Sequence, residues 1–150
     1  MITYQQESLV TSKADAIPLL EKHWEEIALN KDKIKLNPDW DAYANLEDAG
    51  VLKIFTARDA DNKLVGYFVV FVKAHIHYKD HLFSYNDIIF VDQDYRKGFT
   101  SVRLMKFAEK CLKADGVGVM IVNTKRHKPF DSLLIWLGYK HIENIYSKVL

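Results

Sequence analysis

The stretch whose residue types could do chemistry begins at Asp87. An apolar strand, Asp87-Ile88-Ile89-Phe90-Val91, leads through an acidic bend into the turn Tyr95-Arg96-Lys97-Gly98-Phe99-Thr100-Ser101, after which a helix is expected. The first N–H groups of a helix have no intrahelical partner and lie at the positive end of its dipole, so a turn that exposes them binds anions. Arg96 and Lys97 add positive charge there. The segment therefore predicts a phosphate site.

The elements that must position this turn follow from hydrophobic periodicity, capping residues and turn residues. Before the turn we expect a strand over residues 2–9, helices over 14–28 (capped by Ser12) and 39–48, and strands over 51–58, 64–78 and 82–91, with the last two joined by a turn at Lys79-Asp80. After it we expect a helix ended by Asp115-Gly116, a strand over 117–123 parallel to the strand before the turn, a helix over 129–137 and one or two strands over 139–150.

Length and composition favour one globular domain over residues 1–150, because 150 residues leave no room for two comfortable cores. A net charge of +1 gives no reason to expect a nucleic-acid or membrane-surface partner. The single Cys111 cannot form an internal disulfide, and no stretch is typical of a signal peptide or a membrane span. A cytoplasmic protein is the expectation.

The strand and turn resemble motif A of the GNAT superfamily of acetyl-CoA-dependent N-acyltransferases. In that motif a strand ending in Val is followed by Arg-x-x-Gly-x-Gly or Ala at the pyrophosphate of coenzyme A. Here Gly98 stands two rather than three positions after Arg96, and Thr100 replaces the second Gly or Ala. The shortened form, with His23-Trp24-Glu25-Glu26 and the ending after Leu137-Gly138-Tyr139, is similar to small GNAT-like proteins encoded by tailed bacteriophages.

The resemblance implies an α/β (α+β) GNAT fold, with a mixed central sheet of about six to seven strands, about four flanking helices and a splayed strand pair at the acyl-CoA site. It also implies the residues that bind acetyl-CoA as co-substrate, with backbone groups of the motif strand holding the acyl carbonyl and the turn holding the pyrophosphate. Carried over by position, these residues are Phe90, Val91, Arg96, Lys97, Gly98, Phe99, Thr100, Ser101 and Asn123.

The resemblance places the general base at Asp87 or Tyr85, which strand alternation puts on one face together with Ile89 and Val91. Partial burial would raise the pKa of the Asp87 carboxyl and improve it as a base. The alternative is that Asp87 caps or ion-pairs a neighbouring element.

His77 and His75 share a face of the preceding strand, so His77 is a third catalytic candidate. The two histidines with Asp87 could also bind a metal, or they could lie at the exposed end of a hairpin; we expect no metal site. The usual general acid of the family is a Tyr four residues before the Gly of the final helix, and here that position is Leu134. Ser132, Tyr139 or Tyr146 could replace it, or the thiolate could leave unassisted.

The acceptor site is expected between the two early helices and the motif strand. Its substrate-binding candidates are His23, Glu26, Trp40 and Tyr43, where His23 is also explained as a core or wall histidine. With Asp87, such an acidic and aromatic lining suits a cationic amine, either a small molecule or a lysine or N-terminus of a protein.

Two functions fit these residues, besides a third option that the turn holds another phosphorylated ligand. The first is an N-acetyltransferase that transfers an acetyl group to a primary amine by direct attack in a ternary complex. The second is a GNAT-like module of weak or no activity that docks on a host or phage protein, as the shortened turn and Leu134 suggest. The viral resemblance would place either in a host cytoplasm, and the apolar C-terminal residues permit a homodimer.

Overall fold

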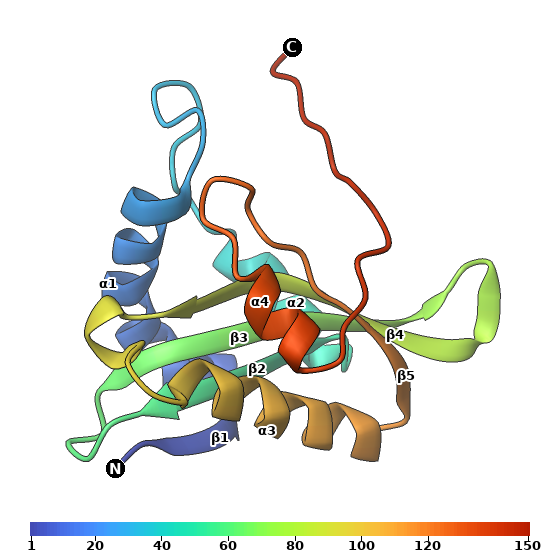
Figure 1. Ribbon diagram of the computed structural model, residues 1–150, viewed down its shortest axis with the longest axis horizontal. Coiled ribbons are helices and arrows are strands. Elements are labelled where there is room, and N and C mark those ends of the chain that lie inside the picture. The colour runs from blue at the N-terminus through green and yellow to red at the C-terminus, as the bar shows by residue number, and fades with distance from the viewer.

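A computed structural model describes residues 1–150 (Figure 1). Its centre is a five-stranded sheet in the order β1-β2-β3-β4-β5, antiparallel except for the parallel pair β4 and β5. The strands are β1 Thr3–Glu7, β2 Leu52–Arg58, β3 Leu64–His75, β4 Tyr78–Val91 and β5 Val117–Ile121. The helices are α1 Leu9–Ile27, α2 Trp40–Asp48, the single 3₁₀ turn η1 Gln93–Tyr95, α3 Thr100–Ala114 and α4 Asp131–Trp136.

Helices cover both faces of the sheet, and each face has its own apolar core. On one face, Leu19 of α1 packs with Ile54, Tyr67 and Phe90 of the strands. On the other, α3 packs on the sheet through three fully buried residues, Leu104, Ala108 and Leu112. The central strand β3 is apolar on both sides because both sides are covered, as its composition predicts. None of the helices is long and apolar enough to span a membrane.

The first helix begins earlier than the sequence predicts, at Leu9 rather than Ala14. Ser8, not Ser12, is its N-cap: the Ser8 hydroxyl accepts from the Thr11 N–H at 3.4 Å. Ser12 instead donates its hydroxyl to the Ser8 carbonyl at 2.9 Å inside the first turn. Both serines are typical N-cap residues. Because the helix begins earlier than predicted, the first strand is shorter than predicted.

The β3–β4 hairpin turns at Ile76 and His77, so the prediction of a turn at Lys79-Asp80 is wrong. Aromatic rings stabilise the pairing beyond the predicted point. The His75 ring lies 4.9 Å from Tyr78 and 4.7 Å from Phe83, centre to centre. Such cross-strand ring contacts stabilise the pairing of the two strands.

No strand follows α4, so the expected strands over 139–150 are wrong, and the sheet has five strands rather than six or seven. The last backbone hydrogen bond joins the Tyr139 N–H to the Leu134 carbonyl, and beyond it the chain extends away from the sheet (Figure 1). Apolar side chains of this segment, among them Ile142, Ile145 and Tyr146, are exposed. The segment is apolar, as the prediction of strands assumed, but it does not pair with an edge of the sheet.

Candidate active site

The edge of β4 that faces β5 is open over its last residues. Pairing between the two strands ends at Tyr85 and Ile121, although β4 continues to Val91. At the point of separation the Asn123 N–H donates to the Asn86 Oδ1 at 2.7 Å, so a side chain takes the place of the next backbone partner. This is the splayed strand pair that the motif predicts, and it leaves a row of β4 backbone groups without a neighbouring strand.

A β-bulge interrupts β4 in the same region. Val69 of β3 faces Ile88 and the next residue, Val70, faces Asn86, so Asp87 is the extra residue without a partner. A bulge bends the strand and redirects the side chains around it.

The bulge changes which residues share a face with Asp87. Ile89 and Val91 pack with the α3 core, whereas Asp87 accepts a short hydrogen bond from the Tyr43 hydroxyl of α2, on the opposite face, where Phe90 also packs. The expectation that Asp87 lies beside Ile89 and Val91 is therefore wrong, because regular alternation does not hold across a bulge.

The turn after β4 is fastened to α1 by Arg96. Its guanidinium donates to both oxygens of Glu26 at 2.7 and 2.8 Å, and its Nε donates to the Val91 carbonyl at 2.7 Å. The guanidinium also lies 5.0 Å from the centre of the Phe90 ring. Hydrogen bonds from Arg96 hold the pKa of Glu26 below its usual value. The guanidinium expected to contact phosphate is thus paired with a carboxylate of the protein itself.

Backbone N–H groups, by contrast, are free at the start of α3. The Arg96 N–H donates to Gln93 and the Arg103 N–H to Phe99, but the amides from Lys97 to Val102 have no partner. Phe99, at the N-cap, provides no side-chain cap. Gly98 has a φ of +91°, a conformation that favours glycine and lets the backbone turn its amides outward. The turn therefore has free backbone amides, as the predicted phosphate site requires, while Arg96 itself is paired with Glu26.

A cleft of about 560 Å³ runs along the open edge of β4. It joins the turn to the loop after β5, whose His127 bonds through Nε2 to the Ile27 carbonyl at 2.9 Å. Basic side chains predominate over acidic ones. The lining residues include His23, Glu26, Asn86, Asp87, Phe90, Val91, Arg96, Ser101, Asn123, Lys125, His127 and Lys128.

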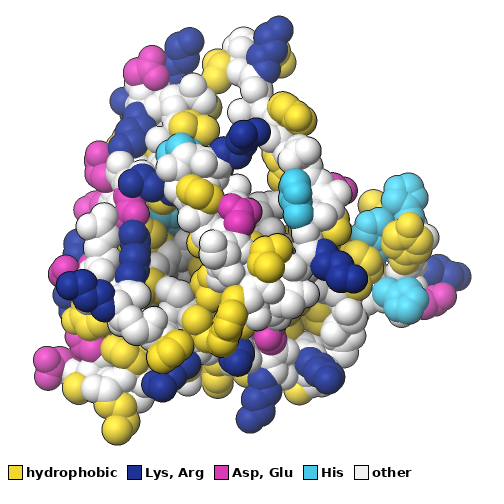
Figure 2. Space-filling view, in the orientation of Figure 1, with side chains coloured by type: hydrophobic (Ala, Val, Ile, Leu, Met, Phe, Trp, Pro, Cys, Tyr) yellow, Lys and Arg dark blue, Asp and Glu magenta, His cyan; other side chains and the backbone are white.

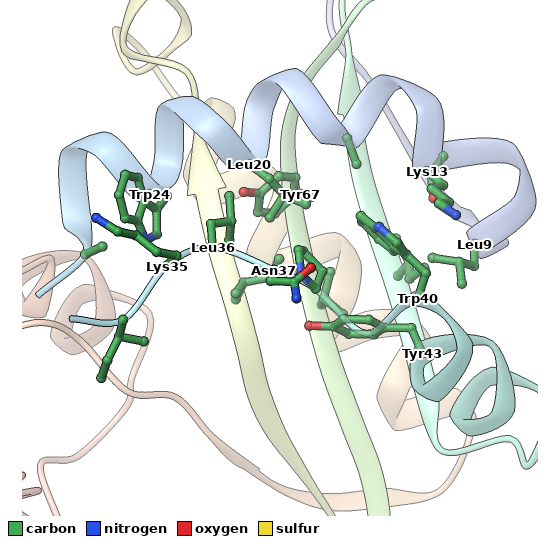
Figure 3. Close-up of a pocket in the computed structure, with 18 of the residues that line it drawn as sticks. Leu9, Lys13, Leu20, Trp24, Lys35, Leu36, Asn37, Trp40, Tyr43 and Tyr67 are labelled. Atoms are coloured by element: carbon green, nitrogen blue, oxygen red, sulfur yellow. The ribbon is translucent and has the colours of Figure 1, made fainter. Parts of the chain in front are cut away.

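A second cavity of about 520 Å³ lies under α1, α2 and the connector between them (Figure 3). Of its 24 lining residues 15 are hydrophobic, and they include Trp24, Trp40, Tyr43 and Tyr67. None is acidic, so the expected acidic lining is absent from this cavity. Glu26 and Asp87 line the cleft instead. Ile88 and Lys125 line both spaces, which are therefore neighbours.

Two hydrogen-bonded pairs stand between the cavities. In the first, Tyr43 donates to Asp87, and burial raises the pKa of the Asp87 carboxyl above its usual value despite that bond. In the second, the His23 Nδ1 lies 2.8 Å from the Tyr67 hydroxyl. Burial lowers the pKa of His23 to about 4, so its imidazole is neutral at pH 7. Both pairs link a group that lines the cleft to a phenol that lines the second cavity.

The sequence does not single out Tyr67, because it stands in an apolar strand typical of a protein core. It is only 2% exposed, and its ring packs 6.3 Å from Phe90. A tyrosine among buried aliphatic residues does indicate a polar contact, since a buried phenol hydroxyl needs a hydrogen-bond partner.

Two of the catalytic candidates line neither cavity. His77 is exposed at the tip of the hairpin, where its N–H donates to the His75 Nδ1 at 3.1 Å. Figure 2 shows histidine side chains gathered on this projecting tip. Tyr85 lies on the paired part of β4, with the Lys73 ammonium 5.3 Å from its ring centre. No cluster of His, Cys, Asp or Glu could hold a metal ion, and Asp87 lies far along β4 from His75 and His77.

None of the three residues considered as replacements for the general acid, Ser132, Tyr139 and Tyr146, lines the cleft. Leu134 is buried. The Tyr139 hydroxyl donates to Glu109 at 2.9 Å, away from the open strand edge.

Solved structures share this fold at low sequence identity. A transcriptional regulator from Bacillus halodurans C-125 superposes with a TM-score of 0.79 at 13% identity, over 100% of both chains. Aminoglycoside acetyltransferase HMB0005 from an uncultured soil metagenomic sample has a TM-score of 0.77 at 17% identity, over 100% of this chain and 99% of that chain. Glucosamine-6-phosphate N-acetyltransferase from Arabidopsis thaliana has a TM-score of 0.76 at 12% identity, over 99% of this chain and 98% of that chain.

No family model matches the sequence, and no curated protein matches it. The structural likeness shows that the chain has the GNAT fold, as the motif predicts. The further resemblance to phage proteins stays a prediction.

Proposed function

We propose that this protein is an N-acyltransferase that uses acetyl-CoA as co-substrate and acetylates a primary amine. The observation that carries the proposal is the open β4 edge leading to the unpartnered amides of α3, beside a second cavity large enough for an acceptor. Several of the solved structures with this fold are acetyltransferases, which is consistent with that use.

The donor fits the cleft by the chemistry of its lining. The amides from Lys97 to Val102 offer a row of donors at the positive end of a 15-residue helix, which suits a pyrophosphate. Lys125 and Lys128 add positive charge on the opposite wall. When bound, the donor supplies an activated acetyl thioester.

Backbone groups on the open edge of β4 activate the acyl carbonyl for attack. In an antiparallel strand the N–H and C=O of one residue point to the same side. The Asp92 N–H donates to the Val65 carbonyl on the β3 side, so the N–H and C=O of the preceding residue, Val91, point to the open side. The Val91 carbonyl accepts from Arg96 there. That amide hydrogen-bonds the carbonyl oxygen of the acyl group, where negative charge develops during attack.

Asp87 is the general base. Its carboxylate lies at the boundary between the two cavities, and burial raises its pKa toward the range useful for accepting a proton. The amine nitrogen forms a bond to the acyl carbon, the carbon–sulfur bond breaks, and the amine proton moves to Asp87 directly or through water. The thiolate leaves without a side-chain acid and takes its proton from solvent.

Calorimetric titration with acetyl-CoA and free coenzyme A tests the donor site. We expect micromolar affinity, about 8 kcal/mol. Gly98→Asp should abolish binding because it places a side chain and a negative charge in the turn. Gly50→Asp is the matched control: Gly50 also has positive φ, +74°, and open space around it, but it ends α2 away from the cleft. Loss of binding in both variants, or in neither, would contradict the proposal.

Asp87→Asn separates an enzyme from a docking module. An acyltransferase that uses Asp87 as base should lose at least about 100-fold in thiol release with acetyl-CoA and a mixture of putrescine, lysine and phenylalanine. Its affinity for acetyl-CoA should be unchanged. Equal thiol release by the variant and the unchanged protein would remove Asp87 from the mechanism.

A further inference from the structure

The second cavity combines an apolar body with unpaired positive charge. Lys13, Lys35 and Lys125 all line it, and no carboxylate lies within ion-pair distance of any of them. The Lys13 ammonium lies 5.0 Å from the ring centre of Trp40, and the Lys35 ammonium donates only to the Lys31 carbonyl, at 2.6 Å. The lining of the cavity therefore includes cations and no anion, and the Asp87 carboxylate lies only at its boundary with the cleft.

The apolar part of the lining is also incompletely covered. Leu29, Ile34 and Leu36 of the connector line the cavity, yet they are 54%, 57% and 39% exposed. In Figure 3, Lys35 lies beside Trp24 at one end of the cavity and Lys13 beside Trp40 at the other, with Tyr67 and Leu36 between them. A ligand with an apolar body would cover these side chains and gain from leaving water.

These observations argue against a polycationic acceptor. A primary amine arrives mostly as an ammonium ion, and each further positive charge on it would be repelled by the lysines in a partly enclosed space. A carboxylate on the same molecule reverses the sign of that interaction and gives the lysines a partner.

We propose that the acceptor is a small aromatic or branched-apolar primary amine that also carries a carboxylate. This rests on the proposed acyltransferase function, because it assigns the second cavity to the acceptor. The carboxylate binds Lys13 or Lys35, the apolar body packs on Trp24, Trp40 and the connector, and the amine reaches the boundary formed by Tyr43 and Asp87.

Tryptophan fluorescence provides a direct readout. Two of the three tryptophans, Trp24 and Trp40, line the cavity, so a Trp136→Phe background reports on it alone. The probes are two matched pairs, phenylalanine with phenethylamine and leucine with isoamylamine, together with putrescine, each titrated in the presence of saturating coenzyme A.

The carboxylate member of each pair should bind about tenfold more tightly than its decarboxylated partner, and putrescine should bind most weakly. Lys13→Gln combined with Lys35→Gln should reduce the tenfold preference to about twofold or less. Lys33→Gln, on the same connector but outside the cavity, is the control and should leave it unchanged. Tighter binding of putrescine, equal binding within the pairs, or a preference that survives the double substitution would overturn the assignment.

Failure of this proposal is distinguishable from failure of the proposed function. If acetyl-CoA binds in calorimetry but the carboxylate probes show no preference, only the acceptor class is wrong. If acetyl-CoA does not bind, the acyltransferase proposal fails, and the same fluorescence titrations without coenzyme A still decide whether the cavity selects apolar carboxylates.

Discussion

Two arginine–glutamate pairs in this molecule have nearly the same geometry but different roles. In the first, which we call the sheet pair, Arg58 of β2 donates to both oxygens of Glu7 in β1 at 2.7 and 2.9 Å. In the second, the cleft pair, Arg96 donates to both oxygens of Glu26 at 2.7 and 2.8 Å. Both join segments far apart in the sequence.

Burial is what distinguishes the pairs. The side chains of Arg58 and Glu7 are 4% and 8% exposed, whereas that of Arg96 is 38% exposed and that of Glu26 is 13% exposed. The sheet pair is also completed by Asp15, which accepts from Arg58 at 2.8 Å, and by the Thr56 hydroxyl. Opening a buried pair that has all its hydrogen bonds costs much free energy, while a partly exposed pair beside a cleft can exchange partners.

The largest effect is expected from Arg58→Ala. Removing the guanidinium leaves the Glu7 carboxylate buried without its partner, which typically costs about 3–5 kcal/mol in the free energy of unfolding. Urea denaturation measures this change in the free energy of unfolding. The double variant Arg58→Met with Glu7→Gln, which removes both charges, should recover a large part of the loss. A cost below about 1 kcal/mol would mean that the pair is hydrated in solution.

Acid should weaken the sheet pair over a defined pH range. Burial alone would raise the pKa of Glu7, but hydrogen bonds from Arg58, Thr56 and Gln5 overcome it and lower the pKa to about 2. Since Glu7 is more acidic in the folded than in the unfolded chain, protonation favours unfolding. Its stabilising contribution is complete above its ordinary pKa of 4.5 and is lost as the pH falls toward about 2.

The stability difference between the unchanged protein and Glu7→Gln measures this contribution. It should be large at pH 6 and shrink steadily toward pH 2, because the protonated carboxyl then resembles the amide. A difference that stays constant over that range would show that Glu7 does not titrate with folding.

Much of this architecture was predictable because it depends on local signals. The turn from Tyr95 to Ser101 could be predicted from its glycine, its charges and its place between a strand and a helix. The parallel strand after α3 follows from the rule that a helical crossover returns to the same sheet. These features need only neighbours in sequence.

The partners of the site residues were not predictable in the same way. Arg96 was expected to bind phosphate, but its partner Glu26 stands 70 residues earlier in the chain. Asp87 was assigned to a face by alternation, and the bulge that turns it toward Tyr43 leaves no mark in the sequence. Arg58 was taken only as the end of a strand, because nothing local distinguishes a buried arginine from a surface one.

The smallest effect, and the one that most sharpens the comparison, is expected from the cleft pair. If Glu26 holds Arg96 away from the donor's phosphates, Glu26→Gln should free a positive charge and tighten acetyl-CoA binding about threefold, while Arg96→Ala should weaken it by about the same factor. Each change should alter the free energy of unfolding by less than about 1 kcal/mol, because the guanidinium is 38% exposed. Calorimetry on the two variants decides between two roles. Opposite changes in affinity mean that Glu26 competes with phosphate for Arg96, whereas a loss in both means that the pair positions the turn and works as a structural unit, as the sheet pair does.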